Sequence, residues 1–347
     1  MNRTLKNIGF SFILISGSLV LVGALLLAAD TYCHYKFKQS AGLNYRGYRG
    51  DVVPKKKNDE IRVVVLGGST VFGYGVRYDE SFPYYLEKLL NANSTETSFS
   101  VVNLGMNSVG AYSFVGLLED YLNLDYDLAI LYEGYNDTDY TKENYHRGRR
   151  NSPLFRLTGY FPILQEVLTE KAMLLKHGGD ISSAYQNKTV FNGNLAQRVA
   201  GDSLSKAVTV INQLENQLNN FDKQSKNLGA VRTPGHCGPK WNFYCTQIVN
   251  AVRWGQEHQK KMMVVSQPYL TGSGHREQQT ELAAELKSSF SNVSGFKYVN
   301  LGEAILLTDE KLAFDGMHLL PKGNQLIAER LQPEVLQLAK EPARLSR

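Results

Sequence analysis

The sequence predicts an α/β fold with helices on both faces of a parallel sheet, preceded by one transmembrane helix. Three observations support this. The β-branched run Ile61–Leu66 is typical of a strand buried on both faces. Strand-like and helix-like segments then alternate, which favours a doubly wound sheet with right-handed crossovers. The uncharged stretch Ile8–Ala29 can cross a hydrocarbon core of about 30 Å at about 1.5 Å per residue.

The N-terminal apolar stretch is expected to be a retained anchor. Arg3 and Lys6 precede it, as is typical of an end kept in the cytoplasm. The alternative is a cleaved signal peptide, which has a shorter apolar region of about 7–15 residues and a small-residue cleavage site. Leu27-Ala28-Ala29 matches such a site poorly. Residues 1–30 are therefore assigned to a cytoplasmic stub and anchor, and residues 31–60 to a juxtamembrane connector.

The spacing of apolar residues predicts the elements that follow the first strand. Helical spacing predicts helices over residues 81–92, 112–122 and 322–338, and Pro333 is expected to bend or end the last one. Short β-forming runs predict four further strands: Phe99–Leu104, Asp127–Tyr132, Lys261–Ser266 and Phe296–Asn300. The main domain is thus expected at residues 61–338, with a tail at 339–347.

A large insertion at about residues 138–260 interrupts the alternation between the third and fourth strands. It contains a segment with the pattern of an amphipathic helix, Ser203–Phe221. An insertion at the strand-end side of a sheet is well placed to form a lid or a substrate wall, and it serves equally well as scaffold for a partner. The sequence leaves both interpretations open.

Two cysteines bear on the cellular compartment. Cys237 and Cys245 bracket the turn-rich segment CGPKWNFYC and form a candidate disulfide, with two free thiols as the alternative. A disulfide persists only in an oxidising compartment. Lys36 and Lys38 directly after the span blur the charge rule for orientation, so the cysteines carry more weight. The main domain is expected outside the cytoplasm.

Polar or glycine-bearing turns follow three predicted strands directly, at Ser69, Gly105 and Asn136. Sites in open parallel sheets form at the carboxyl ends of the strands, so these turns are expected to converge. Asp315 and His318, three residues apart before the last helix, are expected to join them and to present both side chains on one side.

These residue types fit acyl transfer. A serine hydroxyl becomes nucleophilic when an imidazole takes its proton and a carboxylate fixes the imidazole tautomer. Ser69 is the candidate nucleophile, His318 the base and Asp315 the orienting carboxylate. The backbone N–H groups of Ser69 and Gly105, with the Asn136 amide, are candidate donors of an oxyanion hole.

The same residues resemble the sequence blocks of the SGNH (GDSL-type) hydrolases. The four blocks occur in the family's order: Gly67-Gly68-Ser69-Thr70, Asn103-Leu104-Gly105, Gly134-Tyr135-Asn136-Asp137 and Asp315-Gly316-Met317-His318. The common G-D-S is G-G-S here, with Gly68 in place of the aspartate. The resemblance implies a flavodoxin-like three-layer α/β/α fold and the catalytic roles given above. The segment Leu43–Gly50 resembles the lead-in of membrane-anchored bacterial members, which implies a single-pass protein of the bacterial inner membrane.

Each block has a structural alternative. Glycines commonly make strand–helix turns, Asn136-Asp137 is compatible with an Asx turn, and Asp315 with His318 is compatible with a surface pair capping the last helix. A phosphate-binding loop is disfavoured because neither G-x-x-x-x-G-K-[ST] nor G-x-G-x-x-G is present. Four blocks in order favour catalysis.

The expected activity is therefore hydrolysis of a carboxylic ester, with O-acetyl groups of an envelope or exported polysaccharide as the candidate substrate. An acyltransferase or a lipid or thioester hydrolase on the same site is one alternative, and a non-catalytic glycan- or partner-binding envelope protein is another. No cofactor or metal is expected, because the histidines show no metal-ligand spacing. The net charge of +5 is spread along the chain, which argues against a nucleic-acid partner. The oligomeric state is left open.

Overall fold

The computed structural model describes residues 3–38, 43–92, 97–107, 109–138, 153–176, 235–272 and 274–341. The chain forms two compact units, one of Met1–Lys38 with Pro162–Asn212 and the other of Gln39–Phe161 with Gln213–Arg347. The predicted helix Ser203–Phe221 and most of the expected tail lie outside the described residues.

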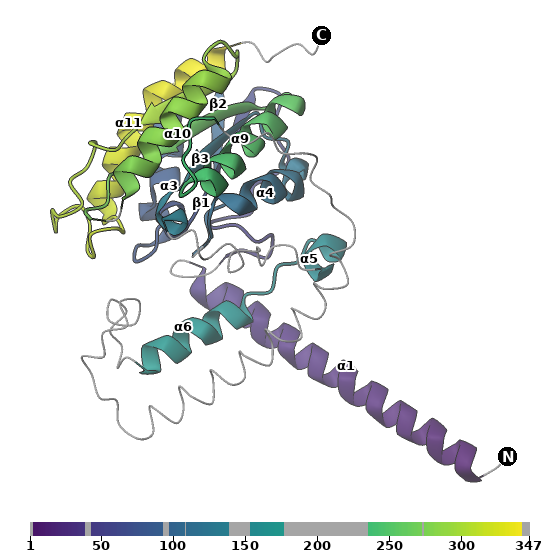
Figure 1. The fold of residues 1–347 in the computed structure, drawn as a ribbon. Helices are drawn as coiled ribbons and strands as arrows, with labels where there is room; N and C mark the ends of the chain where they lie inside the picture. Colours follow the sequence, from purple (N-terminus) through teal and green to yellow (C-terminus); the bar gives the residue numbers. More distant parts are fainter. Residues whose placement is uncertain are drawn as a thin grey trace. The chain divides into compact units, whose positions relative to one another are not determined.

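A parallel sheet forms the centre of the larger unit (Figure 1). Its five strands run in the order β2-β1-β3-β4-β5. Their bounds are β1 Glu60–Gly67, β2 Ser98–Asn103, β3 Leu128–Tyr132, β4 Lys261–Ser266 and β5 Phe296–Asn300. This is the flavodoxin-like strand order, so the predicted fold class is confirmed.

Helices cover both faces of this sheet and make the three layers (Figure 1). On one face lie α3 (Phe82–Ala92) and α11 (Pro321–Lys340), and on the other lie α4 (Phe114–Asp120), α9 (Asn242–Glu257) and α10 (His275–Phe290). Between the sheet and the α3–α11 pair, Val63 and Val65 pack in one core with Leu86 and Leu331. Full burial of such side chains contributes about 1.5–3 kcal/mol each, which holds the strand ends in fixed relative positions.

Several helices differ from the prediction. The segment expected as one helix at 112–122 is a short 3-10 helix, Ala111–Ser113, followed by the shorter α4. The last helix continues through Pro333 to Lys340, so of the two outcomes expected for this proline, a bend or an end, the end is wrong. The sequence prediction did not include α2 (Ser69–Phe72), α9 or α10.

The smaller unit contains the long N-terminal helix α1 (Arg3–Phe37). Its part from Phe10 to Phe37 is long and apolar enough to cross a membrane, a property shared by membrane spans and signal sequences. Near its end, Asp30 accepts hydrogen bonds from the backbone N–H groups of Ile163, at 2.7 Å, and Leu164, at 2.5 Å. Asp30 therefore caps the start of α6 (Leu164–Lys176).

Part of the segment expected as a connector lies inside the larger unit. Leu43, Tyr48 and Arg49 are buried. The Arg49 guanidinium, 3 % exposed, donates hydrogen bonds to the carbonyl oxygens of Phe72, of Gly73 at 2.6 Å and of Val76 at 2.6 Å. These carbonyls belong to the end of α2 and the turn after it, so Arg49 satisfies acceptors that a short helix leaves open.

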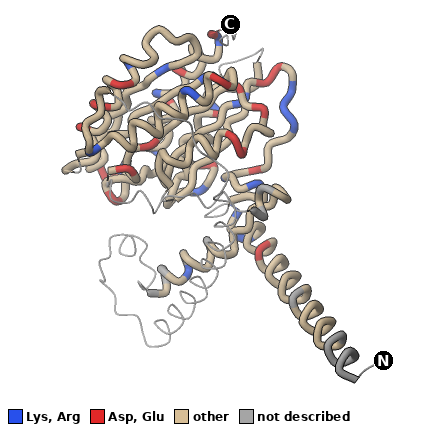
Figure 2. Tube along the Cα trace, turned by 45° about the vertical axis from the view of Figure 1, so that its right-hand side comes forward, with Lys and Arg blue, Asp and Glu red and all other residues tan. Residues whose placement is uncertain are grey.

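Acidic and basic residues are interspersed along the described part of the larger unit (Figure 2). A short α-helix of the same unit, α5, spans Pro153–Thr158.

Candidate active site

Ser69 lies where the first strand ends. It is the first residue of α2, directly after β1 and Gly68, and its side chain is half-buried. The first N–H groups of a helix have no carbonyl partner within that helix. The hydroxyl of Ser69 and its own backbone N–H are therefore placed together at the carboxyl edge of the sheet.

His318 and Asp315 reach Ser69 from the segment before α11. His318 Nε2 lies 2.8 Å from Ser69 Oγ, and His318 Nδ1 lies 2.6 Å from Asp315 Oδ2. The other oxygen, Asp315 Oδ1, accepts the backbone N–H groups of Met317 at 3.0 Å and of His318 at 2.7 Å. Gly316 adopts a φ of +76°, a left-handed conformation that glycine adopts at little cost, and so closes this turn. The D-x-x-H segment thus folds around its own carboxylate.

Electrostatics keep the Asp315 carboxyl ionised. Burial alone would raise its pKa, but hydrogen bonds from the His318 ring and from two backbone N–H groups favour the charged form, and the net pKa lies below its usual value. An ionised Asp315 accepts a hydrogen bond from the Nδ1–H of His318 and leaves Nε2 free to take a proton from Ser69.

Asn136 lies beside the backbone that precedes Ser69. It occupies the 3-10 helix Tyr135–Asp137 after β3, and its Nδ2 donates to the carbonyl of Val109 at 3.0 Å. A Cβ added to Gly68 would lie 2.1 Å from that Nδ2. A side-chain amide carries two hydrogens, so one remains for a ligand next to Ser69.

Gly105 lies against the helix that carries Ser69. A Cβ there would lie 2.2 Å from the backbone nitrogen of Phe72, so only glycine permits this approach. Its N–H donates to Asn103 Oδ1 at 2.9 Å. The structure therefore brings Gly105 to α2, and its role as an oxyanion donor stays a prediction.

Glu133 is a residue to which sequence reasoning gave no role. It is 1 % exposed, and its Oε1 accepts the backbone N–H groups of Gly134 at 3.0 Å and of Asn136 at 3.2 Å. A Cβ on Gly68 would also lie 2.7 Å from Glu133 Oε2. Burial, and next the charge of Asp137, raise the pKa of Glu133. The carboxyl group thus holds the turn that presents Asn136.

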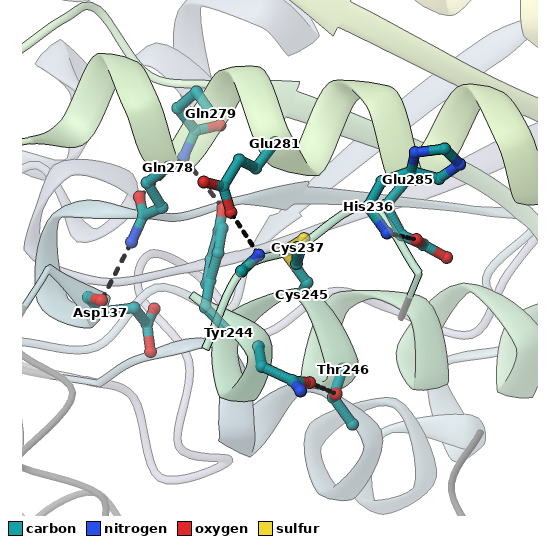
Figure 3. The surroundings of a disulfide bond; sticks show 12 residues. Asp137, His236, Cys237, Tyr244, Cys245, Thr246, Gln278, Gln279, Glu281 and Glu285 are labelled. Carbon is teal, nitrogen blue, oxygen red and sulfur yellow. Dashed lines mark hydrogen bonds between the residues drawn. A yellow bond between two sulfur atoms is a disulfide. The ribbon is translucent and has the colours of Figure 1, made fainter. Parts of the chain in front are cut away.

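A second set of contacts supports this turn from α9 and α10 (Figure 3). Tyr244 Oη donates to the carbonyl of Glu133 at 2.7 Å, and Gln279 Nε2 donates to Tyr244 Oη at 3.0 Å. Gln278 Nε2 donates to the carbonyl of Asp137 at 2.9 Å. Both ends of the turn are therefore tied to neighbouring helices.

The disulfide lies next to Tyr244 in the chain. The structure joins Cys237 to Cys245 in α9, so the bond links a loop to a helix (Figure 3). Backbone N–H groups of that loop donate to α10, from His236 to Glu285 at 3.0 Å and from Gly238 to Glu281 at 2.7 Å. The bond and the two carboxylates hold the start of α9 against α10.

Aromatic rings flank the imidazole of His318. The Tyr74 ring centroid lies 5.0 Å from that of His318, and the Phe314 ring stacks on it at 5.7 Å. Phe314 is 37 % exposed, so it presents an apolar surface beside the reacting groups. Within the described ranges, no group of three or more His, Cys, Asp or Glu side chains is placed to hold a metal ion.

No family model and no curated protein matches the chain. Among solved structures, a lipase/acylhydrolase from Enterococcus faecalis is similar at 12% identity over 82% of this chain and 100% of that chain, with a TM-score of 0.43. A family 3 carbohydrate esterase from Clostridium thermocellum is similar at 12% identity over 80% of this chain and 96% of that chain, with a TM-score of 0.40.

Proposed function

We propose that the chain is a serine-dependent carboxylic-ester hydrolase of the SGNH (GDSL) type. The observation that carries the proposal is the chain of two contacts from Ser69 Oγ to His318 Nε2, at 2.8 Å, and from His318 Nδ1 to Asp315 Oδ2, at 2.6 Å. This arrangement contains the nucleophile, the base and the orienting carboxylate that acyl transfer requires. A helix cap or a surface ion pair of Asp315 and His318 would not require the second imidazole nitrogen to contact Ser69 Oγ.

The first half of the reaction forms an acyl-enzyme. Ser69 Oγ attacks the ester carbonyl carbon while His318 Nε2 takes the hydroxyl proton. The former carbonyl oxygen becomes negative, and the Ser69 N–H and the second hydrogen of Asn136 Nδ2 stabilise it. The bond between the acyl carbon and the leaving oxygen then breaks, the leaving oxygen takes the proton from His318 to form the alcohol, and Ser69 keeps the acyl group.

The second half regenerates the serine. Water donates a proton to His318 Nε2 and attacks the acyl carbon, and the same donors stabilise the second tetrahedral oxyanion. When this intermediate collapses, the carboxylic acid leaves and Ser69 Oγ recovers its proton from His318. Asp315 stays ionised throughout and stabilises the imidazolium in both steps.

We further propose that the enzyme is anchored in the bacterial inner membrane, with its catalytic domain outside the cytoplasm, and that it removes O-acetyl groups from an envelope polysaccharide. The apolar helix α1 and the Cys237–Cys245 disulfide support the location, since such a bond persists in oxidising compartments. The location in turn supports a substrate of the cell envelope.

The test uses full-length protein in detergent micelles with p-nitrophenyl acetate as substrate. Wild type is expected to hydrolyse the ester and to be labelled by a fluorophosphonate, while Ser69→Ala and His318→Ala lose nearly all turnover. Ser291→Ala, at the exposed end of α10, is the matched control and is expected to match wild type. Wild type that neither turns over nor is labelled would refute the enzyme proposal. Acetate release from an O-acetylated polysaccharide then tests the substrate class.

A further inference from the structure

Gln267 is a buried amide at the carboxyl edge of the sheet, directly after β4. Its side chain is 0 % exposed, and both ends of the amide are hydrogen-bonded. Gln267 Oε1 accepts the backbone N–H of Tyr135 at 2.9 Å, and Gln267 Nε2 donates to Thr70 Oγ1 at 2.8 Å. One side chain therefore bridges two turns that are far apart in sequence.

The two partners of Gln267 are direct neighbours of the reacting groups. Thr70 follows Ser69 in α2, and Tyr135 precedes Asn136 in its 3-10 helix. The residue after Gln267 adds a second tie, because Tyr135 Oη donates to the carbonyl of Pro268 at 2.5 Å. The segment after β4 thus holds the Asn136 turn through two groups of Tyr135, its backbone N–H and its side-chain hydroxyl.

The chemistry makes the separation of these two turns important. In the tetrahedral intermediate one carbon carries both the Ser69 oxygen and the oxyanion to which Asn136 donates a hydrogen bond. The distance between Ser69 Oγ and Asn136 Nδ2 must therefore match the two oxygens of that one carbon. A misplacement of about 1 Å in such a site can cost about 10²-fold in rate. A buried amide with both ends bonded has few alternative positions, since breaking either bond leaves a polar group unsatisfied.

We infer that Gln267 is a positioning residue that sets the distance between the nucleophile Ser69 and the oxyanion donor Asn136. The inference rests on the proposed esterase activity. Gln267 touches neither substrate nor reacting atoms and acts through Thr70 and Tyr135. Its loss should therefore slow the chemical step more than it weakens substrate binding.

The first test replaces the amide while keeping the length of the side chain. In full-length protein in detergent, Gln267→Met is expected to lower kcat for p-nitrophenyl acetate by about 10- to 100-fold while KM changes by less than about threefold. Gln332→Met is the matched control, because its amide also joins two elements, donating from α11 to the carbonyl of Leu89 in α3 at 3.1 Å, away from the site. Equal kcat values for wild type and Gln267→Met, or an equal loss in Gln332→Met, would overturn the inference.

A double-mutant cycle separates positioning from general destabilisation. If Gln267 acts by placing Asn136, then Gln267→Met should cost less than about threefold in a protein that already carries Asn136→Ala. Full additivity of the two losses would overturn the inference. An inactive wild type would instead refute the proposed function, so the two failures are distinguishable.

Gln267→Glu provides a second variant in case Gln267→Met does not fold. A protonated glutamic acid can donate to Thr70 Oγ1 as the amide does, whereas the carboxylate can only accept, so the Thr70 hydroxyl would have to turn and a buried negative charge would lie between the two turns. The kcat of this variant relative to wild type is expected to rise as the pH falls from about 9 to about 6, since burial raises the pKa of a carboxyl group. A constant ratio across that range would contradict the positioning role.

Discussion

Replacing Gly68 by alanine is expected to remove most of the turnover while the protein stays folded. The new methyl group would lie 2.1 Å from Asn136 Nδ2, 2.7 Å from Glu133 Oε2 and 3.1 Å from the carbonyl oxygen of Val109. Gly68 has a φ of −83°, outside the left-handed region that favours glycine, so no positive-φ strain adds to this clash. The effect should therefore come from displacement of the Asn136 amide.

The size of the effect follows from these distances. Carbon and nitrogen atoms in contact are separated by roughly 3.5 Å, so the amide must retreat by more than about 1 Å from its present position. Removing one oxyanion donor typically costs about 10²–10³ in kcat, or about 2.7–4 kcal/mol. Gly68→Ala is expected to fall in this range, with KM nearly unchanged because the donor acts mainly on the transition state.

The assay is steady-state hydrolysis of p-nitrophenyl acetate, with thermal unfolding measured in parallel. Gly116→Ala is the matched control, since a Cβ at this position in α4 would meet nothing within 4 Å. It should keep full activity and gain about 0.5–1 kcal/mol of stability from the loss of a helical glycine. If Gly68→Ala kept a wild-type kcat, the placement of Asn136 as an oxyanion donor would be refuted.

Three further predictions concern groups around the site. Asp315→Asn should lower kcat by about 10⁴-fold, because the amide donates to His318 Nδ1 and leaves the proton on Nε2; a loss below about tenfold in hydrolysis assays would contradict the triad. The pKa of Glu133 is raised by burial and a neighbouring carboxylate, so the folded protein binds a proton that the unfolded chain releases. The free energy of unfolding should thus fall as the pH rises above the ordinary carboxyl range, and Glu133→Gln should reduce that fall. If the free energy of unfolding, measured at several pH values, depended on pH equally in both proteins, the raised pKa of Glu133 would be contradicted. Cys237→Ser should cost about 2–3 kcal/mol of stability and abolish the effect of reductant on the Tm; a wild-type Tm insensitive to reductant would speak against the bond.

Local patterns were sufficient for the sheet. The run at Ile61–Leu66 predicted β1, which extends one residue further at each end, and the bounds of the other four strands were placed to within one residue. Strands buried on both faces are continuous apolar runs, and such runs need no long-range information to be seen. The strand ends then showed where Ser69 and Asn136 would meet.

Helices α9 and α10 were missed for different reasons. The inner face of α10 buries polar side chains, including His275, Gln278 and Glu285, so its apolar stripe is weak. The α9 sequence does carry buried apolar residues at helical spacing, such as Ile248 and Val252, but it lies in a stretch interpreted as insertion and disulfide loop. Contacts between buried polar side chains depend on the tertiary structure, so the spacing of apolar residues along the sequence does not reveal them.

The supporting residues of the site were missed for the same physical reason. Gln267 directly follows β4 at the catalytic edge, so the rule that located Ser69 could have singled it out. Glu133 directly follows β3 and shared that signal, whereas Arg49 carried none, because a charged residue in an isolated sequence is expected at the surface. Only the fold shows that buried carbonyl groups accept hydrogen bonds from Arg49 and that backbone N–H groups donate to Glu133.

The partly buried segment Leu43–Gly50 limits how the domain could be released by proteolysis. A protease that cuts before Leu43 would leave the Arg49 guanidinium on the carbonyls of Phe72, Gly73 and Val76. A cut after Gly50 would remove that guanidinium and leave its carbonyl acceptors buried without a donor. Each unsatisfied group would cost about 1–3 kcal/mol of stability. The smallest working fragment therefore starts at or before Arg49, because the arginine that holds the end of α2 sets the limit and the end of the apolar helix does not.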